Sequence, residues 1–570
     1  MLKFDVLVIG SGGAGMRAAL EASRQGGGSV ALMTKMFPTR SATGCAQGGI
    51  NGALKNADPN DSVEKHFFDT VKGSDYLGDQ DAVEFFVTNA PDCIRELDYF
   101  GVPFSRDKEG RIAQRNFGGA SSPRTCYSAD KTGHVILHTL YEQCLKYKVK
   151  VLSEWYLLQL VVDNGKLCGV VALELKTGRI VPIAAKAVVM ATGGAGRMYW
   201  LRTTNPFAST GDGMAACLNA GIALKDPEFV QFHPTGLAGT GILMSEASRG
   251  EGGYLINNKG ERFMQRYAPE KMELATRDLV SQAIETEIKE GRGFGGTGMS
   301  AYVLLDLRHL GREKILERLP QIRDLAIAFE QVDPIEQPIP IRPSCHYSMG
   351  GIDVVDYRTC ATAVEGVFAA GECSCISIHG ANRLGGNSLA DIVVFGKFAG
   401  KGAQACALER SFYNEGAVLE AAKAWEAKRE KVLARTGGPT VASIRDRLAE
   451  TMWYKVGVFR KGAEMEEALN TVDGLLAEYQ SCRVGDPSLV YNTAFVNYIE
   501  LGSMLTVAKA VVLGALNRTE SRGCHLREDY PHRDDANFLK HTLVTKEGDA
   551  YKLSYRDVVV TKYQPAERKY

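Results

Sequence analysis

The chain opens with a hydrophobic pattern that is typical of a βαβ unit. Residues 4–10 form a short apolar run of buried-strand character, and residues 11–22 follow as a tight turn that opens a helix of small residues. After three glycines at 26–28, residues 30–33 form a second apolar run. We expect the two runs to be neighbouring parallel strands joined by the helix.

Further elements follow from the apolar spacing: helices at residues 81–100 and 134–147, and a hairpin of residues 151–163 and 168–175. At residues 186–190 and 366–372 an apolar strand again runs into glycines, as it does at the start of the chain. Because three such strand ends lie far apart in the sequence, we expect one α/β Rossmann-like domain that is interrupted by an insertion.

After about residue 408 the pattern changes to long helical stretches at residues 418–435, 444–479 and 494–516. This pattern indicates a helical bundle. The polar, tyrosine-rich remainder predicts an irregular C-terminal tail. The expected organisation is a Rossmann-like domain at residues 1–236 and 350–415, an inserted α+β capping domain at 237–349, a helical domain at 416–529 and the tail at 530–570.

The composition is that of a folded protein with several domains. Apolar residues make up 45% and charged residues 24% of the 570 residues. Basic and acidic residues number 67 each, so no net charge attracts nucleic acid, and we expect no nucleic acid partner. The 13 cysteines are scattered, with Cys373 and Cys375 as the one close pair. This spacing predicts buried thiols and no metal site.

Neither an export signal nor a membrane span is predicted. The first strand begins almost at Met1, which leaves no space for a signal peptide. No stretch approaches the roughly 18 to 20 apolar residues that cross a bilayer. We therefore expect a cytoplasmic protein without a direct membrane span, whose association with a membrane, if any, requires a partner.

The first strand ends in a GxGxxG pattern, formed by Gly10, Ser11, Gly12, Gly13, Ala14 and Gly15. Glycine lets this backbone turn tightly and approach a pyrophosphate, whose charge meets the helix N-terminus. A NAD site usually has an acid at the end of the second strand, but Thr34 and Lys35 stand here, which disfavours NAD. The following loop suits an extended cofactor through its polar and glycine residues, which include Ser41, Ala42, Thr43, Gln47, Gly48 and Gly49.

Several longer motifs follow in order across nearly the whole chain. They are FPTRS at 37–41 with AQGG at 46–49, QFHPTG at 231–236, RGEGG at 249–253, CHYSMGG at 345–351, HGANRLGGNS at 379–388 and ESRG at 520–523. With these motifs the chain resembles the flavoprotein subunits of the succinate dehydrogenase and fumarate reductase family. The resemblance implies FAD as cofactor and hydride transfer between succinate and fumarate.

A dicarboxylate needs cationic and hydrogen-bonding anchors, and a guanidinium can bind a planar carboxylate through two parallel hydrogen bonds. His233, His346 and Arg383, with the hydroxyl of Ser245, supply such groups in glycine-rich loops. One histidine in such a place is more often structural, but two together with an arginine favour a binding site. Phe117 is assigned to the same substrate site.

The resemblance implies roles for further residues. Arg277 would exchange the proton while the flavin exchanges the hydride, and Glu246 with Arg249 would relay protons to solvent. A very weak acid such as arginine can protonate the strong base that hydride addition to fumarate creates. A surface ion pair is the alternative interpretation of Glu246 and Arg249. The implied FAD contacts also include Asp212, Glu372, Ser388 and Leu389.

One position departs from the family pattern. Members of the membrane-complex type carry a histidine directly after Arg-Ser that is joined covalently to the flavin, and Ala42 stands there in this chain. Cys45 is three residues away, and a small buried thiol is its preferred interpretation. We therefore predict a noncovalent FAD. Because the histidyl bond goes with a higher flavin potential in the family, its absence favours fumarate reduction. Ser245 replaces a threonine of close relatives and keeps the hydroxyl.

Three alternatives stay open: L-aspartate oxidase, a thiol-linked fumarate reductase, and a non-catalytic flavin scaffold for electron transfer. The glycine pair after Arg383-Leu384 argues against the first, and the set of His233, Arg277, His346 and Arg383 argues against the last. The chain shows no iron-sulfur ligand set, so its electrons must pass through another protein. The resemblance implies an iron-sulfur subunit and a membrane anchor, which would hold the chain on the cytoplasmic face of the inner membrane.

Overall fold

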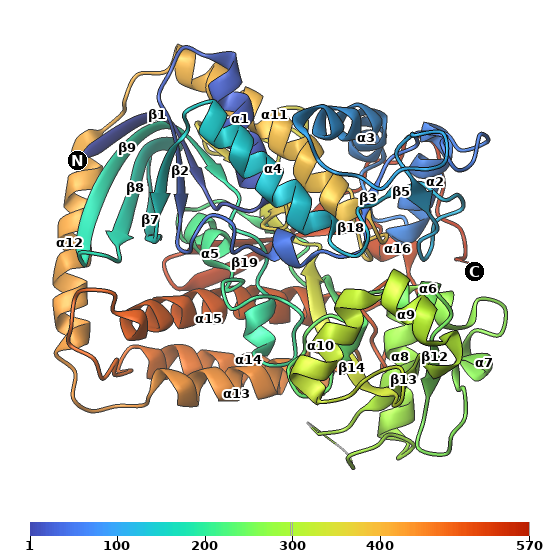
Figure 1. Cartoon of the computed structure of the whole chain (residues 1–570). Coiled ribbons are helices and arrows are strands. Elements are labelled where there is room, and N and C mark those ends of the chain that lie inside the picture. The colour runs from blue at the N-terminus through green and yellow to red at the C-terminus, as the bar shows by residue number, and fades with distance from the viewer. Residues whose placement is uncertain (297, 299, 569–570) are drawn as a thin grey trace.

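The computed structural model of the protein describes residues 1–296, 298 and 300–568. Figure 1 shows a sheet with helices packed on it, a lobe at the lower right and a helical layer below the sheet. The main sheet has seven strands in the order β6-β2-β1-β9-β8-β7, with β16 paired to β9. These strands are β1 (Leu2–Ile9), β2 (Val30–Thr34), β6 (Lys150–Ser153), β7 (Trp155–Asp163), β8 (Lys166–Glu174), β9 (Arg179–Met190) and β16 (Val367–Ala369).

Strand β1 lies at the centre of the parallel part of this sheet. Its Val6 pairs with Val30 of β2 on one side and with Ala187 of β9 on the other. Strands β7, β8 and β9 are antiparallel, and the β7–β8 hairpin turns at Asn164 and Gly165, as the sequence predicts. Because β1, β2, β9 and β16 run parallel, their carboxyl ends meet at one edge of the sheet.

Helix α1 (Gly13–Gln25) follows β1 and packs against α11 (Asn387–Glu409). The two helices approach closely because Gly400 of α11 lies against the backbone of Ala18, where a Cβ atom would overlap it. The predicted helical segments before residue 150 correspond to α3 (Gln80–Phe100) and α4 (Thr132–Lys146). The main body also contains α2 (Val63–Gly73), α5 (Asp212–Asn219), α12 (Glu415–Leu433) and the short strands β3 (Ile50–Asn51), β4 (Gln114–Arg115) and β5 (Thr125–Cys126).

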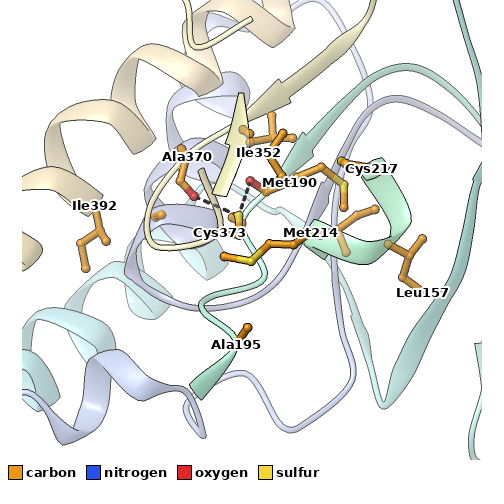
Figure 2. Close-up of a cluster of buried hydrophobic side chains, with 14 of the residues drawn as sticks. Leu157, Met190, Ala195, Met214, Cys217, Ile352, Ala370, Cys373 and Ile392 are labelled. Carbon is orange, nitrogen blue, oxygen red and sulfur yellow. Dashed lines mark hydrogen bonds between the residues drawn. The ribbon is translucent and has the colours of Figure 1, made fainter. Parts of the chain in front are cut away.

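The buried hydrophobic cluster in Figure 2 contains sulfur-containing side chains beside aliphatic ones such as Leu157 and Ile352. Met190, Met214, Cys217 and Cys373 are each at most 2% exposed, and the Cys373 thiol donates to the carbonyl oxygen of Met190 at 3.2 Å. All 13 cysteines are free thiols, and Cys45 is the exposed one among them. Burial raises the pKa of Cys373 to about 11, so this thiol is protonated and acts as a small apolar side chain.

The lobe at the lower right of Figure 1 has its own hydrophobic core, built from residues between 237 and 341. Its sheet has the order β11-β14-β13-β12. The elements are β11 (Val230–Leu237), β12 (Tyr254–Ile256), β13 (Val303–Asp306), β14 (Ile339–Ser348), α6 (Ala247–Gly250), α7 (Met264–Tyr267), α8 (Arg277–Lys289), α9 (Arg312–Arg318) and α10 (Pro320–Glu330). The chain enters on β11 and leaves on its antiparallel neighbour β14. This core lies within the predicted capping insertion at 237–349, whose limits stay predictions.

The helical layer consists of α13 (Val441–Lys455), α14 (Gly462–Tyr479) and α15 (Thr493–Asn517). The prediction of one helical stretch at 444–479 is wrong, because the chain turns between α13 and α14. Val456 pairs with Arg460 across this turn, and the buried guanidinium of Arg460 donates to the carbonyl oxygen of Glu228 at 2.8 Å. The apolar spacing continues through the turn, so the periodicity did not reveal the break.

Within the described residues, α15 is the one helix that is long and apolar enough to cross a membrane. This finding corrects the expectation that no stretch approaches that length. In the fold 61% of its most apolar window is buried, and the helix packs against α5, α13 and α14. Its Glu500 accepts a hydrogen bond from Lys35 at 2.6 Å. These contacts account for its apolar composition within the folded chain.

The prediction of an irregular tail is also wrong for residues 540–557, which form the hairpin β18 (Lys540–Glu547) and β19 (Ala550–Asp557). Strand β18 extends a sheet of order β17-β15-β10-β18-β19. The other members are β10 (Leu224–Lys225), β15 (Gly351–Asp353) and β17 (Ser374–Cys375), and α16 (Asp535–Phe538) precedes the hairpin. The hairpin's outer strand is largely exposed, so its polar composition hid the strand pattern.

A buried ion cluster attaches this hairpin to the body. His541 lies between Asp226 at 2.6 Å and Asp79 at 3.1 Å, and its side chain is fully buried. Lys225 also interacts with both carboxylates. Burial alone would lower the pKa of His541, but the two carboxylates raise it to about 9.

We expect the stability of the protein to fall between about pH 6.5 and pH 9 because of His541. Its pKa in the folded state lies above the unfolded value, so its contribution is complete below the unfolded pKa and is lost as the pH rises through the folded pKa. The contribution is on the order of 3 kcal/mol. Urea midpoints measured across this range test it. His541→Asn should remove the decline, and a decline of the same size in that variant would contradict the assignment.

Candidate active site

The glycine turn after β1 forms one end of a long cavity. Gly10 has φ +107°, and a Cβ atom there would overlap the carbonyl oxygen of Ala191 at the end of β9. Gly12 caps α1, and a Cβ atom at Gly15 would overlap the carbonyl oxygen of Gly10. The turn therefore brings the free amides of the α1 N-terminus to the cavity wall, an arrangement that suits a pyrophosphate.

Hydrogen bonds connect Thr34, the last residue of β2, and Lys35, which follows it, to neighbouring residues of the cavity wall. The Ser11 hydroxyl donates to Thr34 Oγ1 at 2.9 Å, and the Lys35 ammonium donates to Asp212 and Glu500 at 2.6 Å each. Burial alone would lower the pKa of Lys35, but these carboxylates raise it. Asp212 is held further by the Tyr156 hydroxyl at 2.7 Å. Lys35 thus carries a fixed positive charge beside Asp212, one of the implied FAD contacts.

The loop after β2 lines the middle of the cavity. Ala42 begins a 3₁₀ turn (Ala42–Cys45), and the Thr43 hydroxyl accepts a hydrogen bond from the amide of Gly13 at 3.0 Å. The Phe117 ring packs against Gly48 and Gly385, and a Cβ atom at either position would collide with the ring. The Cys45 side chain is exposed, so its interpretation as a small buried thiol is wrong. Partial desolvation where it lines the cavity raises the pKa of this thiol, which is therefore protonated and a poor nucleophile. The loop therefore offers an alanine methyl to the cavity at the position where the family resemblance implies a flavin-linking histidine.

The N-terminus of α11 completes this wall. Gly386, with φ +83°, precedes the helix, so the amides of Ser388 and Leu389 in its first turn are free to meet a polar ring edge. Burial raises the pKa of Glu372 to about 7, and Glu372 accepts a hydrogen bond from the amide of Ser348 at 3.1 Å. A carboxyl group in this state can both donate to and accept from ribose hydroxyls.

These features fit FAD, because a Gly-rich turn, two helix N-termini and a paired lysine line one continuous cavity. The cavity also contains nearly all predicted site residues. Gly15 and Arg249 lie behind its lining. Among the described residues, no group of three or more His, Cys, Asp and Glu side chains is placed to hold a metal ion.

Two buried histidines lie at the other end of the cavity, with ring centroids 4.9 Å apart. His233 Nδ1 accepts a hydrogen bond from the amide of Thr235 at 3.2 Å, so Nε2 carries its proton. His346 Nδ1 lies 2.7 Å from the Thr204 hydroxyl. Burial and the nearby arginines hold both pKa values well below the usual value. Both imidazoles are therefore neutral hydrogen-bonding groups at physiological pH.

The two cavity arginines are joined by one amide. Gln231 Oε1 accepts from Arg277 Nη1 and from Arg383 Nη2 at 3.1 Å each, and Gln231 Nε2 donates to the Arg383 carbonyl oxygen at 2.9 Å. Arg383 also stacks on the Tyr347 ring at 4.3 Å. Burial and the charge of Arg277 lower the pKa of Arg383 to about 10, so it stays a cation at neutral pH. The arrangement concentrates positive charge where a dicarboxylate could bind.

Glu246 lies behind Arg277. Its Oε2 accepts from Arg277 Nε at 2.8 Å, and its Oε1 accepts from the amide of Gly118 at 2.9 Å. Burial alone would raise the pKa of Glu246, but the charges of Arg277 and Arg249 lower it. Arg249 Nη2 lies 3.8 Å from Glu246, and both side chains are buried. The interpretation of Glu246 and Arg249 as a surface ion pair is therefore wrong.

The structure adds site residues that the sequence did not single out. The sequence shows Gln231 only as part of a motif, and it predicts no role for Thr204 or Tyr347. Asn51 ties the site to the loop before α11, since it donates to the Gly385 carbonyl oxygen at 2.8 Å. The QFHPTG and CHYSMGG motifs were the available signals for Gln231 and Tyr347, because both residues flank predicted substrate ligands.

The fold and the cavity define an FAD-dependent oxidoreductase for an anionic substrate. Residues 5–389 match the FAD binding domain family, and residues 445–570 match the family described as fumarate reductase flavoprotein C-term. The chain belongs to the family of succinate dehydrogenase and fumarate reductase flavoprotein subunits.

Relatives of both kinds match nearly the whole chain. The 8-methylmenaquinol:fumarate reductase flavoprotein subunit of Wolinella succinogenes is 50% identical, over 99% of this chain and 92% of the relative. The succinate dehydrogenase flavoprotein subunit of Rickettsia bellii is 44% identical, over 98% and 96%. A solved E. coli quinol fumarate reductase chain has a TM-score of 0.96 at 43% identity and covers 100% of this chain and 99% of that one. The structural likeness confirms the predicted fold class.

Proposed function

We propose that the chain interconverts succinate and fumarate as the flavoprotein subunit of a quinone-linked respiratory complex. The convergence of Arg277, Arg383, His233 and His346 at one end of the cofactor cavity carries this proposal. FAD, when bound, exchanges a hydride with the substrate. The side chains of this chain bind the two carboxylates, exclude water and exchange the proton.

Carboxylate binding is divided between the two ends of the substrate. Arg383 offers a guanidinium that suits a planar carboxylate, and the Nε2–H of His233 offers a neutral donor. Ser245, which is 2% exposed, and His346 add polar groups to the same wall. Neutral histidines bind without repelling the arginines, so the site can hold two cations and two imidazoles together.

Arg277 is the proposed proton donor for fumarate reduction. It is the first residue of α8, and Glu246 and Gln231 fix its guanidinium from two sides. A fixed guanidinium stabilises charge that develops on a substrate carbon before the proton moves. Glu246 and Arg249 would return a proton to Arg277 through their contact at 3.8 Å. A second cavity, large enough for about one water molecule, is lined by Arg277, Glu246 and Asn382, so it borders this proposed proton path.

The proposed partners supply electron transfer and attachment to the membrane. Its relatives include flavoprotein subunits of 8-methylmenaquinol:fumarate reductase and of succinate dehydrogenase, and its structural neighbours include a quinol-fumarate reductase. We propose that an iron-sulfur subunit exchanges electrons with the cofactor and that an anchor subunit holds the complex at the cytoplasmic face of the inner membrane. Peripheral association of this kind requires no membrane-spanning segment in this chain.

Fumarate reduction with a reduced viologen dye, succinate oxidation, and aspartate-dependent peroxide formation by the purified full chain test the proposed function. We expect the two dicarboxylate activities and no aspartate oxidation. Aspartate oxidation alone would support the L-aspartate oxidase alternative. A flavin-loaded protein inactive in all three assays would support the electron-transfer scaffold.

We expect the FAD to be noncovalent, because Ala42 offers the cavity a methyl group and the thiol of Cys45 is protonated. Acid precipitation should release all yellow colour into the supernatant. Flavin retained in the pellet would contradict the prediction. The potential of the bound flavin, measured on the same preparation, tests whether fumarate reduction is the favoured direction.

A further inference from the structure

Residues 558–568 run from the main body to the inserted lobe. Val558 follows β19 and packs into a small core that also contains Leu77 and Tyr347, the residue on which Arg383 stacks. The segment then passes the beginning of α3 and the end of α2 and reaches α8 of the lobe. It therefore links three parts of the fold that are distant in sequence.

Gln80, which is fully buried at the start of α3, holds the first half of the segment. Its amide donates to the Val559 carbonyl oxygen at 2.9 Å, and its side-chain nitrogen donates to the Tyr563 carbonyl oxygen at 2.6 Å. Its Oε1 accepts from the amides of Thr561, Lys562 and Tyr563. The side chain of Gln80 thus fixes three consecutive residues, 561–563, and its backbone amide fixes Val559.

The second half of the segment is fixed by ring packing and ion pairs. The Tyr563 ring lies 5.3 Å from the Phe67 ring and 5.0 Å from the Phe68 ring, both of α2. Arg533 donates to the Ala566 carbonyl oxygen at 3.0 Å and to Asp75 at 2.8 Å. These contacts bring the chain to Arg568 along a defined route.

Arg568 lies between the main body and the lobe. Its Nε is 3.3 Å from Asp75, which follows α2, and its Nη2 donates to Asp278 of α8 at 2.8 Å. Asp278 is 4% exposed at its side chain and Arg568 is 16% exposed, so solvent screens this ion pair only weakly. Asp278 is the residue next to Arg277, in the first turn of the same helix.

We propose that Arg568 is a positioning residue, which holds the first turn of α8 against the main body and thereby fixes Arg277 over the substrate. The proposal rests on the proposed role of Arg277 as proton donor. Arg568 acts through Asp278 and touches neither substrate nor cofactor. The substrate ligands His233, His346 and Arg383 stand on other elements, so the segment bears mainly on the proton step.

The electrostatics support this role. Burial alone would raise the pKa of Asp278, but the charge of Arg568 lowers it. Without Arg568 the buried Asp278 carboxylate would lose its cationic partner, and such a loss is unfavourable enough to displace the group or protonate it. Either outcome releases the first turn of α8. A displacement of about 1 Å at a reacting group can lower a rate by roughly 100-fold.

Arg568→Gln tests the proposal in the FAD-loaded full chain. We expect kcat for fumarate reduction to fall by about 10- to 50-fold while KM changes by less than about threefold, because substrate binding is left intact. Arg568→Lys should restore most of the rate. Arg556→Gln is the matched control, since Arg556 forms a similar pair with Asp353 at 2.9 Å in the same C-terminal region but does not contact the lobe. It should keep the wild-type kcat.

Hydrogen exchange gives a measure that does not depend on turnover. Peptides spanning residues 275–281 should exchange faster in Arg568→Gln than in the wild type or in Arg556→Gln. Asp278→Asn should give the same acceleration, and the double variant should add nothing to either change.

Two failures are distinguishable. Unchanged exchange and unchanged kcat in Arg568→Gln would overturn the positioning role, and so would an equal loss of FAD or of kcat in Arg556→Gln. A wild-type protein inactive towards succinate and fumarate would instead overturn the proposed function. In that case hydrogen exchange alone would test whether Arg568 holds the first turn of α8.

Discussion

Replacing Arg277 with glutamine should lower kcat for fumarate reduction by at least about 1,000-fold and leave the bound FAD in place. A positioned general acid contributes roughly 10²- to 10⁴-fold to a rate, and a fixed charge beside the developing carbanion contributes on a similar scale. A 1,000-fold loss corresponds to about 4 kcal/mol of transition-state stabilisation. Arg277 hydrogen-bonds Glu246 and Gln231, and it does not contact the glycine turn at residues 10–15 that suits a pyrophosphate.

The amide of the new glutamine can still donate to Glu246, so the local packing should survive. Its neutral side chain, however, removes the charge that lowers the pKa of Glu246, and the buried carboxyl will take up a proton more readily. Arg308→Gln is the control, because Arg308 pairs with Asp306 on the surface of the same lobe. Visible spectra and initial rates check both variants. Unchanged turnover in Arg277→Gln with intact FAD would show that Arg277 is not the proton donor.

Replacing Gln231 with glutamate should raise KM for fumarate by roughly 100-fold. The side chain accepts from both Arg277 and Arg383 through one oxygen, so a carboxylate there would place a negative charge between the two cations. A charge about 6 Å from a substrate carboxylate, at an effective dielectric of about 20, repels it by roughly 3 kcal/mol. The loss acts on binding of the substrate and transition state alike, so KM should change more than kcat.

Gln404→Glu is the matched control for this variant. Gln404 is also a buried glutamine, but it lies on α11 and donates to the Gly26 carbonyl oxygen at 2.6 Å, outside the cavity. Its replacement introduces the same buried charge without a substrate nearby. Steady-state kinetics with a reduced viologen dye compare the two. If KM rises equally in both variants, the effect comes from a general loss of packing and not from the paired arginines.

Local patterns in the sequence predicted much of the fold. The run of β1, the glycine turn and α1 could be read directly because each feature depends on residues that are close together in the chain. The hairpin at Asn164-Gly165 and the helices α3 and α4 followed from periodicity for the same reason. The break between α13 and α14 was missed because long-range contacts decide it, and the strands β18 and β19 were missed because the polar composition of the exposed outer strand hid their pattern.

The same distinction between local sequence and long-range contacts applies to the candidate site. Motifs identified His233, His346 and Arg383, since each stands in a distinctive local sequence, whereas the role of Arg277 was implied by the family resemblance. The motifs did not show that Gln231 joins the two arginines, because that contact connects residues that are 46 and 152 positions apart. The burial of Glu246 and Arg249 likewise became visible only in three dimensions, and it replaced the surface interpretation of that pair.

The sequence by itself determined which residue types are available for chemistry: a glycine turn that suits a dinucleotide, two histidines and two arginines that suit a dicarboxylate, and Ala42 where the family resemblance implies a flavin-linking histidine. Backbone flexibility and side-chain chemistry belong to individual residues, so they can be read in order along the chain. The tertiary structure alone decided how these groups meet and that residues 558–568 reach α8 beside Arg277. Burial, charge pairing and pKa depend on neighbours from distant segments, and only the folded chain brings those neighbours together.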